Sequence, residues 1–168
     1  MEFTNVPAYN GTLTDSTYVD ANILGNIYKT LFLGKVTTST QYFPKLEDIA
    51  SSWVTQRQNY NQTNQSTIVL AGIYYKYAQI SPTALSTNKI TVSNNKYYDK
   101  FIGSVWQNPY VTKQTIAFAS PVNTFNKLSF GVVLPQNLLL SNSPSTIQSI
   151  QVNFNDGAGY KAVTINQK

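Results

Sequence analysis

The most constraining feature of the sequence is an apolar run, IVLAGIYYKY, at residues 68–77. The run is rich in β-branched and aromatic residues, which favour strands. A continuous apolar segment of this kind is typical of a strand that is buried on both faces. We therefore predict a central strand here, with the rest of the chain covering both of its faces.

The composition also favours strands. Tyr, Thr, Val and Ile are frequent, whereas Ala is less common and Glu is rare. Only 11% of the 168 residues are charged, but 42% are hydrophobic and 13% are aromatic. This content is enough to offset the conformational entropy of the chain, so we expect it to fold as one domain or two small ones. Its exterior is expected to be polar and uncharged, because Asn, Thr, Ser and Gln are abundant.

Two helices are predicted before the central run. The first covers residues 15–34 and has an apolar side chain at every fourth position, namely Val19, Ile23, Ile27 and Leu31. The second covers residues 44–58, because proline suits the first turn and the acidic pair at 47 and 48 suits the positive end of the helix dipole. One face of this second helix is apolar: Leu46, Ile49, Ala50 and Trp53.

Shorter strands are predicted after the central run. Residues 89–100 read KITVSNNKYYDK, which indicates a hairpin about Ser93, Asn94 and Asn95. Short strands are expected at 115–119 and 128–134, the second from its alternation of apolar and smaller residues. The clearest pair comes last, where apolar residues alternate with polar ones before and after the turn NDGAG at 155–159.

The absence of cysteine and histidine excludes several classes of chemistry. Without these residues the chain has no Cys–His or Ser–His–Asp nucleophile, no zinc site built on them, no disulfide and no haem attachment. Among the carboxylates, Glu47 and Asp48 are explained by the helix dipole, and no other pair stands out. The phosphate-binding glycine motifs and the serine hydrolase elbow are missing. We therefore expect no enzyme activity, no cofactor and no metal.

Asp156 is the one carboxylate with a local calcium-ligand pattern, because it follows Asn153 and Asn155. Calcium sites usually gather six to eight oxygens from several carboxylates, and only one carboxylate is local here. A turn in which Asp156 accepts backbone N–H bonds is the simpler explanation. Whether a calcium ion lies near Asp156 stays open.

Aromatic residues beside cations form the candidate binding feature. They occur as YYKY at 74–77 and YYDKF at 97–101. Such side chains stack on sugars or bases, although an ordinary alternation between core and solvent along a strand is the simpler explanation. The exposure of these side chains in the folded chain distinguishes a stacking surface from an ordinary strand. The candidate ligand-stacking residues are Tyr74, Tyr75, Tyr77, Tyr97, Tyr98 and Trp106.

The net charge of +5 and the isoelectric point near 9.3 come from cations that are spread thinly along the chain. Nucleic-acid binding draws on clustered cations, so we expect none. Residues 1–3 are not followed by the basic stretch and apolar run of a signal peptide, and no run approaches the ~20 residues of a membrane span. A weakly charged exterior rich in Asn, Thr, Ser and Tyr is typical of extracellular bacterial and viral β proteins. We expect an extracellular or cell-surface location, with a leader already removed and no membrane insertion.

Several motifs resemble known families. The segment IQVNFNDGAGY at 150–160 is similar to the V-x-F-x-D-G centre of polycystic-kidney-disease-type (PKD-like) β-sandwich domains, with Asn155 in place of the usual glycine. Motifs along most of the chain resemble, in order, the N-terminal region of very large secreted surface proteins of bacteria that export through the type IX pathway. These motifs are YNG at 9–11, DSTYVD at 15–20, ITVSNNKYYD at 90–99, NPY at 108–110, FASP at 118–121 and LLLSN at 138–142.

This resemblance implies a secreted or surface-anchored module with an immunoglobulin-like sheet near its C-terminal end. It also implies an O-glycosylation signal at residues 15–17, with Ser16 as the acceptor. A complete sandwich needs further strands after residue 165. We therefore expect either that the chain is a fragment or that an open sheet edge is covered by the N-terminal half or by a partner.

The predicted fold is α+β and dominated by strands. Residues 1–112 are expected to form helices packed on antiparallel sheet, and residues 113–168 a truncated PKD-like or immunoglobulin-like β-sandwich segment. The expected function is a non-catalytic structural or adhesive module of a secreted bacterial surface protein, with other modules of that protein, other proteins or glycans as partners. A phage or viral structural protein, such as a tail-fibre or capsid component, and a carbohydrate-binding module stay open as alternatives. So does the oligomeric state.

Overall fold

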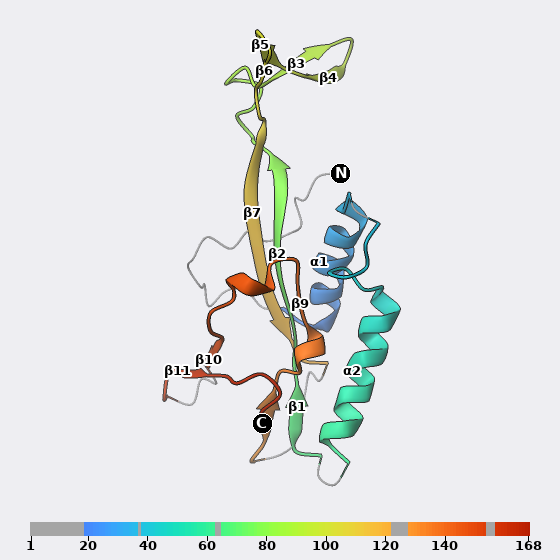
Figure 1. Ribbon diagram of the computed structural model, residues 1–168. Coiled ribbons are helices and arrows are strands. Elements are labelled where there is room, and N and C mark those ends of the chain that lie inside the picture. The colour runs from blue at the N-terminus through green and yellow to red at the C-terminus, as the bar shows by residue number, and fades with distance from the viewer. Residues whose placement is uncertain (1–18, 37, 63–64, 122–127, 154–156) are drawn as a thin grey trace. The chain divides into compact units, whose positions relative to one another are not determined.

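The computed structural model describes residues 19–36, 38–62, 65–121, 128–153 and 157–168 (Figure 1). The chain divides into two compact units, which we describe in turn. The helical unit consists of Met1–Tyr75 and Gln114–Lys168, and the hairpin unit consists of Lys76–Lys113. The predicted α+β class is confirmed, because the described residues contain two α-helices and small sheets of two or three strands.

Helix α1 spans Ala21–Gly34. Asp20 is extended and caps the helix, since its Oδ1 accepts a hydrogen bond of 2.7 Å from the N–H of Ile23. This cap makes the described helix begin at Ala21, whereas the predicted helix began earlier; residues 15–18 lie outside the described residues. The buried positions have the spacing of one helix face: Leu24, Ile27, Tyr28 and Leu31.

Helix α2 spans Leu46–Tyr60, shifted by two residues from its prediction. Its first turn contains Glu47 and Asp48 and its last turn contains Arg57, so the charges at both ends complement the helix dipole. None of its residues is buried. The indole of Trp53 ties the helix to the sheet, because its Nε1–H donates to the carbonyl of Val69 at 2.8 Å.

The predicted central strand is two strands, β1 (Thr67–Val69) and β2 (Ala71–Ile80). They separate at Leu70, whose N–H donates to the carbonyl of Val133 at 2.9 Å. Strand β1 pairs in parallel with β8 (Gly131–Val133). Strand β2 lies between β7 (Tyr110–Ala119) and β9 (Leu139–Ser141), and β9 is parallel to it.

The prediction of an antiparallel sheet is therefore wrong for the pairs β1–β8 and β2–β9. Parallel strands cannot be joined by a tight turn and need a long connection. Here the connection from β1 to β8 contains β2 to β7, and that from β2 to β9 contains β3 to β8. The pairing depends on segments that are far apart along the chain, so local sequence patterns do not reveal it.

The core of the helical unit lies between α1 and the sheet. Alternate residues of β2, namely Ala71, Ile73 and Tyr75, are buried. The ring of Tyr75 packs against Phe43 and Tyr28, with ring centroids 4.7 and 5.9 Å away. Gly72 leaves room for the ring of Phe118, because a Cβ at that position would overlap the ring. This close approach explains a glycine within the longest apolar strand.

Near the C-terminal end, β10 (Gln151–Asn153) and β11 (Tyr160–Ala162) form an antiparallel pair, which confirms the predicted last pair in a shorter form. Short 3₁₀ turns at Gln136–Leu138 and Pro144–Thr146 flank β9. The strands described after residue 113 belong to separate small sheets, so an immunoglobulin-like sandwich is not confirmed. The domain boundary at residues 112 and 113 stays a prediction.

The hairpin unit contains two short hairpins. The predicted hairpin is confirmed as β3 (Ile90–Ser93) and β4 (Lys96–Asp99), and its turn residues Asn94 and Asn95 have φ values of 50° and 59°. Both angles are positive, as a type I′ turn requires. The second hairpin joins β5 (Phe101–Ile102) to β6 (Val105–Trp106). All residues of this unit are described, and its buried residues are Ala84, Ile90 and Pro109.

Candidate binding surface

Tyr75 does not belong to a ligand-stacking surface, so its prediction is wrong. Its side chain is 0% exposed, and its hydroxyl donates to the carbonyl of Tyr42. Burial raises the pKa of the Tyr75 phenol far above its ordinary value, and the neighbouring Tyr28 phenol raises this pKa further. A ring without an exposed face cannot stack on a ligand, so Tyr75 is a core residue.

Tyr74 and Tyr77 are half-buried. The hydroxyl of Tyr74 donates to Oε1 of Gln114 at 3.2 Å and accepts a hydrogen bond of 3.4 Å from Oγ1 of Thr146. Burial raises the pKa of the Tyr77 phenol. Residues 74–77 therefore do not form one exposed surface.

The three other predicted residues are exposed and belong to the hairpin unit. The exposed fractions are 72% for Tyr97, 47% for Tyr98 and 42% for Trp106. Adjacent residues of a strand point to opposite faces. Because both tyrosines of β4 are exposed, neither face of this strand is covered.

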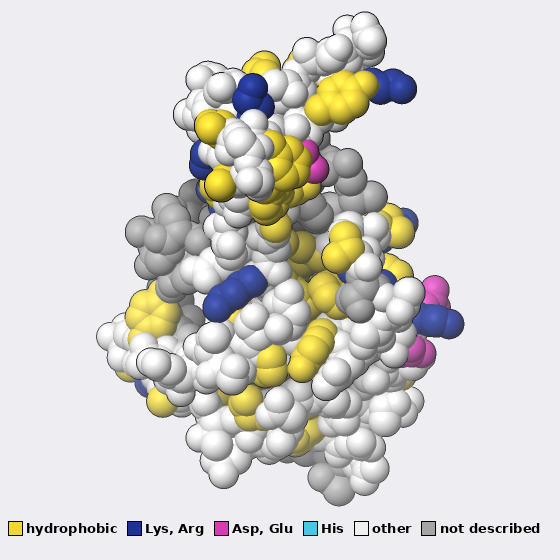
Figure 2. Space-filling view, turned by 45° about the horizontal axis from the view of Figure 1, so that its top comes forward, with side chains coloured by type: hydrophobic (Ala, Val, Ile, Leu, Met, Phe, Trp, Pro, Cys, Tyr) yellow, Lys and Arg dark blue, Asp and Glu magenta, His cyan; other side chains and the backbone are white. Residues whose placement is uncertain are grey.

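Several further apolar residues of the same unit are exposed and were not among the predicted site residues. Together with the three above they make up what we call the hairpin surface: Val92, Tyr97, Tyr98, Phe101, Ile102, Val105, Trp106 and Tyr110. Figure 2 shows hydrophobic side chains gathered on this unit, at the top of the view. The signal was present in FIGSVW at residues 101–106, where apolar residues flank a tight turn at Gly103 without a neighbouring strand to cover them.

The two hairpins meet at an aromatic corner that contains a carboxylate. The indole Nε1–H of Trp106 donates to Oδ1 of Asp99 at 3.2 Å, and the N–H of Gln107 donates to the carbonyl of Lys100 at 2.8 Å. The rings of Trp106 and Tyr110 lie beside each other, with centroids 6.4 Å apart. The corner thus offers two partly exposed aromatic rings and a carboxylate to a ligand.

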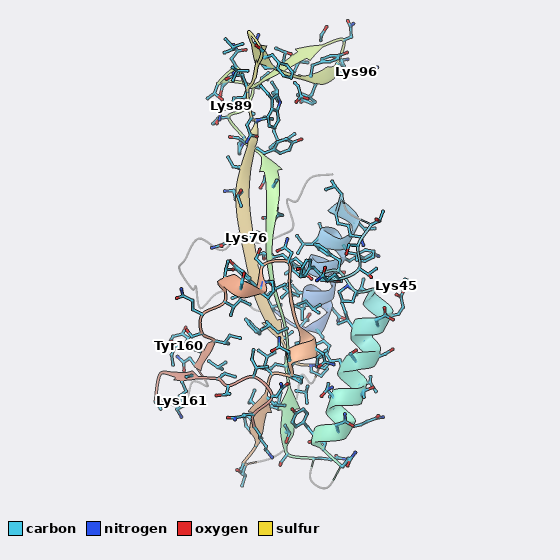
Figure 3. The ribbon with its side chains drawn as sticks, in the orientation of Figure 1. Lys45, Lys76, Lys89, Lys96, Tyr160 and Lys161 are labelled. Atoms are coloured by element: carbon cyan, nitrogen blue, oxygen red, sulfur yellow. The ribbon has the colours of Figure 1, made fainter. Side chains whose placement is uncertain are left out.

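The hairpin unit also carries most of the excess positive charge. Residues 76–113 hold five lysines and one acidic residue, Asp99, whereas cations and acids nearly balance in the rest of the sequence. Figure 3 labels three of these lysines: Lys76 on β2, Lys89 just before β3 and Lys96 on β4. The hairpin unit therefore combines exposed apolar and aromatic side chains with a net positive charge.

The described residues contain no group of three or more acidic, histidine or cysteine side chains that could hold a metal ion. Neither helix is long and apolar enough to span a bilayer. Ser16 and Asp156, the predicted glycosylation and calcium candidates, lie outside the described residues.

Comparison with models of protein families, with curated proteins and with solved structures found no match for this chain.

Proposed function

We propose that this chain is a non-catalytic adhesive or structural module of a secreted bacterial surface protein, and that it makes its contacts through the hairpin surface. The observation that carries the proposal is the hairpin surface itself, which gathers eight of the exposed large apolar side chains of a 38-residue unit. Soluble proteins rarely expose apolar side chains so densely without a binding role. The polar, weakly charged composition and the resemblance described above support the extracellular setting.

Tyrosine and tryptophan suit an adhesive role. Their rings supply rigid contact area at a low cost in side-chain entropy, and the phenol and indole groups add hydrogen bonds. The lysines around them favour a partner with negative charge. Such a surface would bind other proteins or other modules of the same protein.

An attachment assay tests the adhesive role. Beads coated with the chain are rinsed over monolayers that end in alkyl, hydroxyl or carboxylate groups, and the retained beads are counted. We expect retention on the alkyl and carboxylate monolayers. Replacing Tyr97, Tyr98 and Ile102 together by serine should reduce retention on the alkyl monolayer several-fold, because it removes exposed apolar area.

The matched control replaces three comparably exposed apolar residues of the helical unit, Leu33, Val54 and Tyr160, by serine. This variant should keep the retention of the original chain. Equal losses in the two variants would show general stickiness and contradict a specific surface. The setting is tested separately by protease treatment of intact cells of the source bacterium, and a chain that stays protected until lysis would contradict a surface location.

The second candidate is a carbohydrate-binding module, which the aromatic corner favours. Sugar rings stack on exposed aromatic faces while carboxylates accept hydrogen bonds from their hydroxyls. Trp106, Tyr110 and Asp99 provide these groups within one small region. Binding on a glycan array that is lost in Trp106→Ala but kept in Tyr42→Ala, a change at an exposed tyrosine of the helical unit, would support it. Absence of binding to any glycan would exclude it.

A further inference from the structure

A cavity of about 140 Å³, partly open to solvent, lies in the helical unit between α1, α2 and the sheet. Figure 1 shows both helices on the same side of β2 and β9. The face of α1 toward the cavity has the spacing of successive helical turns: Ala21, Leu24, Gly25 and Tyr28. The other walls are the apolar face of α2, the start of β2 and Leu140 of β9.

Small residues create this space. Gly25, Ala50 and Ala71 stand on three different elements where larger side chains would fill it. A Cβ built on Gly25 would meet no heavy atom within 4 Å, so the room beside this residue is open. On α2, Leu46 and Ile49 line the cavity without being buried, which agrees with the absence of buried residues in that helix.

The polar groups at the wall already have partners. The indole N–H of Trp53 donates to the carbonyl of Val69 at 2.8 Å, and the hydroxyl of Tyr28 donates to the carbonyl of Pro44 at 2.6 Å. No charged side chain lines the cavity. Water in this partly open cavity would find no free side-chain partner on its walls, so an apolar molecule that displaces it gains contact area without breaking good hydrogen bonds.

We propose that this cavity binds one small, uncharged, apolar molecule of about the size of benzene or a short alkyl chain. Its volume is close to that of a cavity of about 150 Å³ in another protein, lined by aliphatic and aromatic side chains, that binds benzene. The walls provide contact area and no unpaired hydrogen-bonding group. The site is separate from the hairpin surface, so this binding is a property additional to the proposed adhesion.

Trp53 makes the test direct, because it lines the cavity. The chain contains two tryptophans, so the experiment uses the full chain with Trp106→Phe, in which all indole emission comes from Trp53. Benzene is the probe and benzoate is the charged analogue. We expect benzene to change the emission of Trp53 with saturation and, at ten times its Kd, to raise Tm by about 3 °C. Benzoate should do neither.

Gly25→Leu fills the cavity from α1 and should weaken benzene binding by about tenfold or more. Asn26→Leu adds the same side chain at the next, exposed position of the helix and should leave binding unchanged. Should Gly25→Leu not fold, as judged by circular dichroism, Ala50→Leu fills the cavity from α2 instead. Benzene binding that survives the filling variant, equal binding of benzoate, or no saturable response of the parent would overturn the proposal.

Discussion

At the scale of single residues, two buried phenols anchor the segment that joins the helices. The hydroxyl of Tyr28 donates to the carbonyl of Pro44, and that of Tyr75 donates to the carbonyl of Tyr42. The ring of Phe43, between these two acceptors, packs on both tyrosines. The segment before α2 is thus held by one residue of α1 and one of β2. We expect this cluster to be the most sensitive point of the helical unit.

Tyr75→Phe tests the hydrogen bond without changing the ring packing. It leaves the carbonyl of Tyr42 without its phenol donor, so we expect the free energy of unfolding to fall by about 1–2 kcal/mol. The measurement is urea unfolding followed by circular dichroism. Tyr97→Phe, at a residue that is 72% exposed, is the control and should change stability by less than about 0.5 kcal/mol. Similar losses in both variants would contradict the role of Tyr75.

The same cluster predicts sensitivity to alkaline pH. Burial raises the pKa of Tyr28 to about 12. The unfolded phenol titrates near 10, so the folded chain holds more protons between about pH 10 and 12. Stability should be fully present below about pH 10 and fall as the pH rises through this window. Urea unfolding at several pH values measures the slope, which should be shallower in Tyr28→Phe. An unchanged slope in that variant would count against the assignment.

At the scale of elements, features that depend on neighbouring residues could be predicted from the sequence. The two asparagines at 94 and 95 predicted the hairpin β3–β4, because few residues accept positive φ at both central positions of a turn. Both helices were predicted by their periodicity, with errors at the first turn. The start of α1 was placed too early because Asp20, which caps the helix, could equally stand within a helix.

Other features depend on contacts between distant segments and were not predictable. The partners of β1 and β2 depend on how distant strands pair in the folded chain, and the apolar run carries no information about that pairing. The site prediction was wrong for Tyr75 because of the same run. Tyr74 and Tyr75 are adjacent in sequence, but only Tyr75 is buried in the core. The hairpin surface was only partly predicted, because exposed apolar residues on a pair of short strands look like core residues in a sequence.

The turn of the β3–β4 hairpin offers a test at this scale. Asn95 has a φ of 59°, a region that β-branched residues strongly disfavour. We expect Asn95→Val to destabilise the hairpin by about 1–2 kcal/mol and to speed hydrogen exchange of its amides, measured by NMR. Asn95→Gly accepts the same φ and should preserve their protection. Equal protection in the two variants would show that the turn does not control the hairpin.

At the scale of the whole molecule, burial and charge are divided between the two units. The helical unit contains nearly all buried large side chains, whereas the hairpin unit buries Ala84, Ile90 and Pro109. The hairpin unit in turn holds most of the net positive charge and the densest exposed apolar residues. One unit thus supplies stability and the other supplies the proposed contacts.

This division predicts that the units lose structure separately. Amides of β3–β6 should exchange through local opening, at a free energy well below that of global unfolding, because few apolar contacts hold them. Tyr75→Phe should reduce the protection of amides in β9 and leave that of β3 and β4 unchanged. Native-state hydrogen exchange at increasing urea concentrations measures both. A parallel loss of protection in the two units would mean that the chain opens as a single cooperative body.

The parallel pairs have a consequence for how the chain acquires its fold during translation. Thr67 pairs with Gly131, and Gly72 pairs with Leu139. The most apolar segment is thus synthesised before its parallel partner strands, which leave the ribosome later. Until then this nascent segment presents unpaired backbone and apolar side chains, which are prone to aggregate. A chaperone that shields it during this interval would raise the yield of native protein.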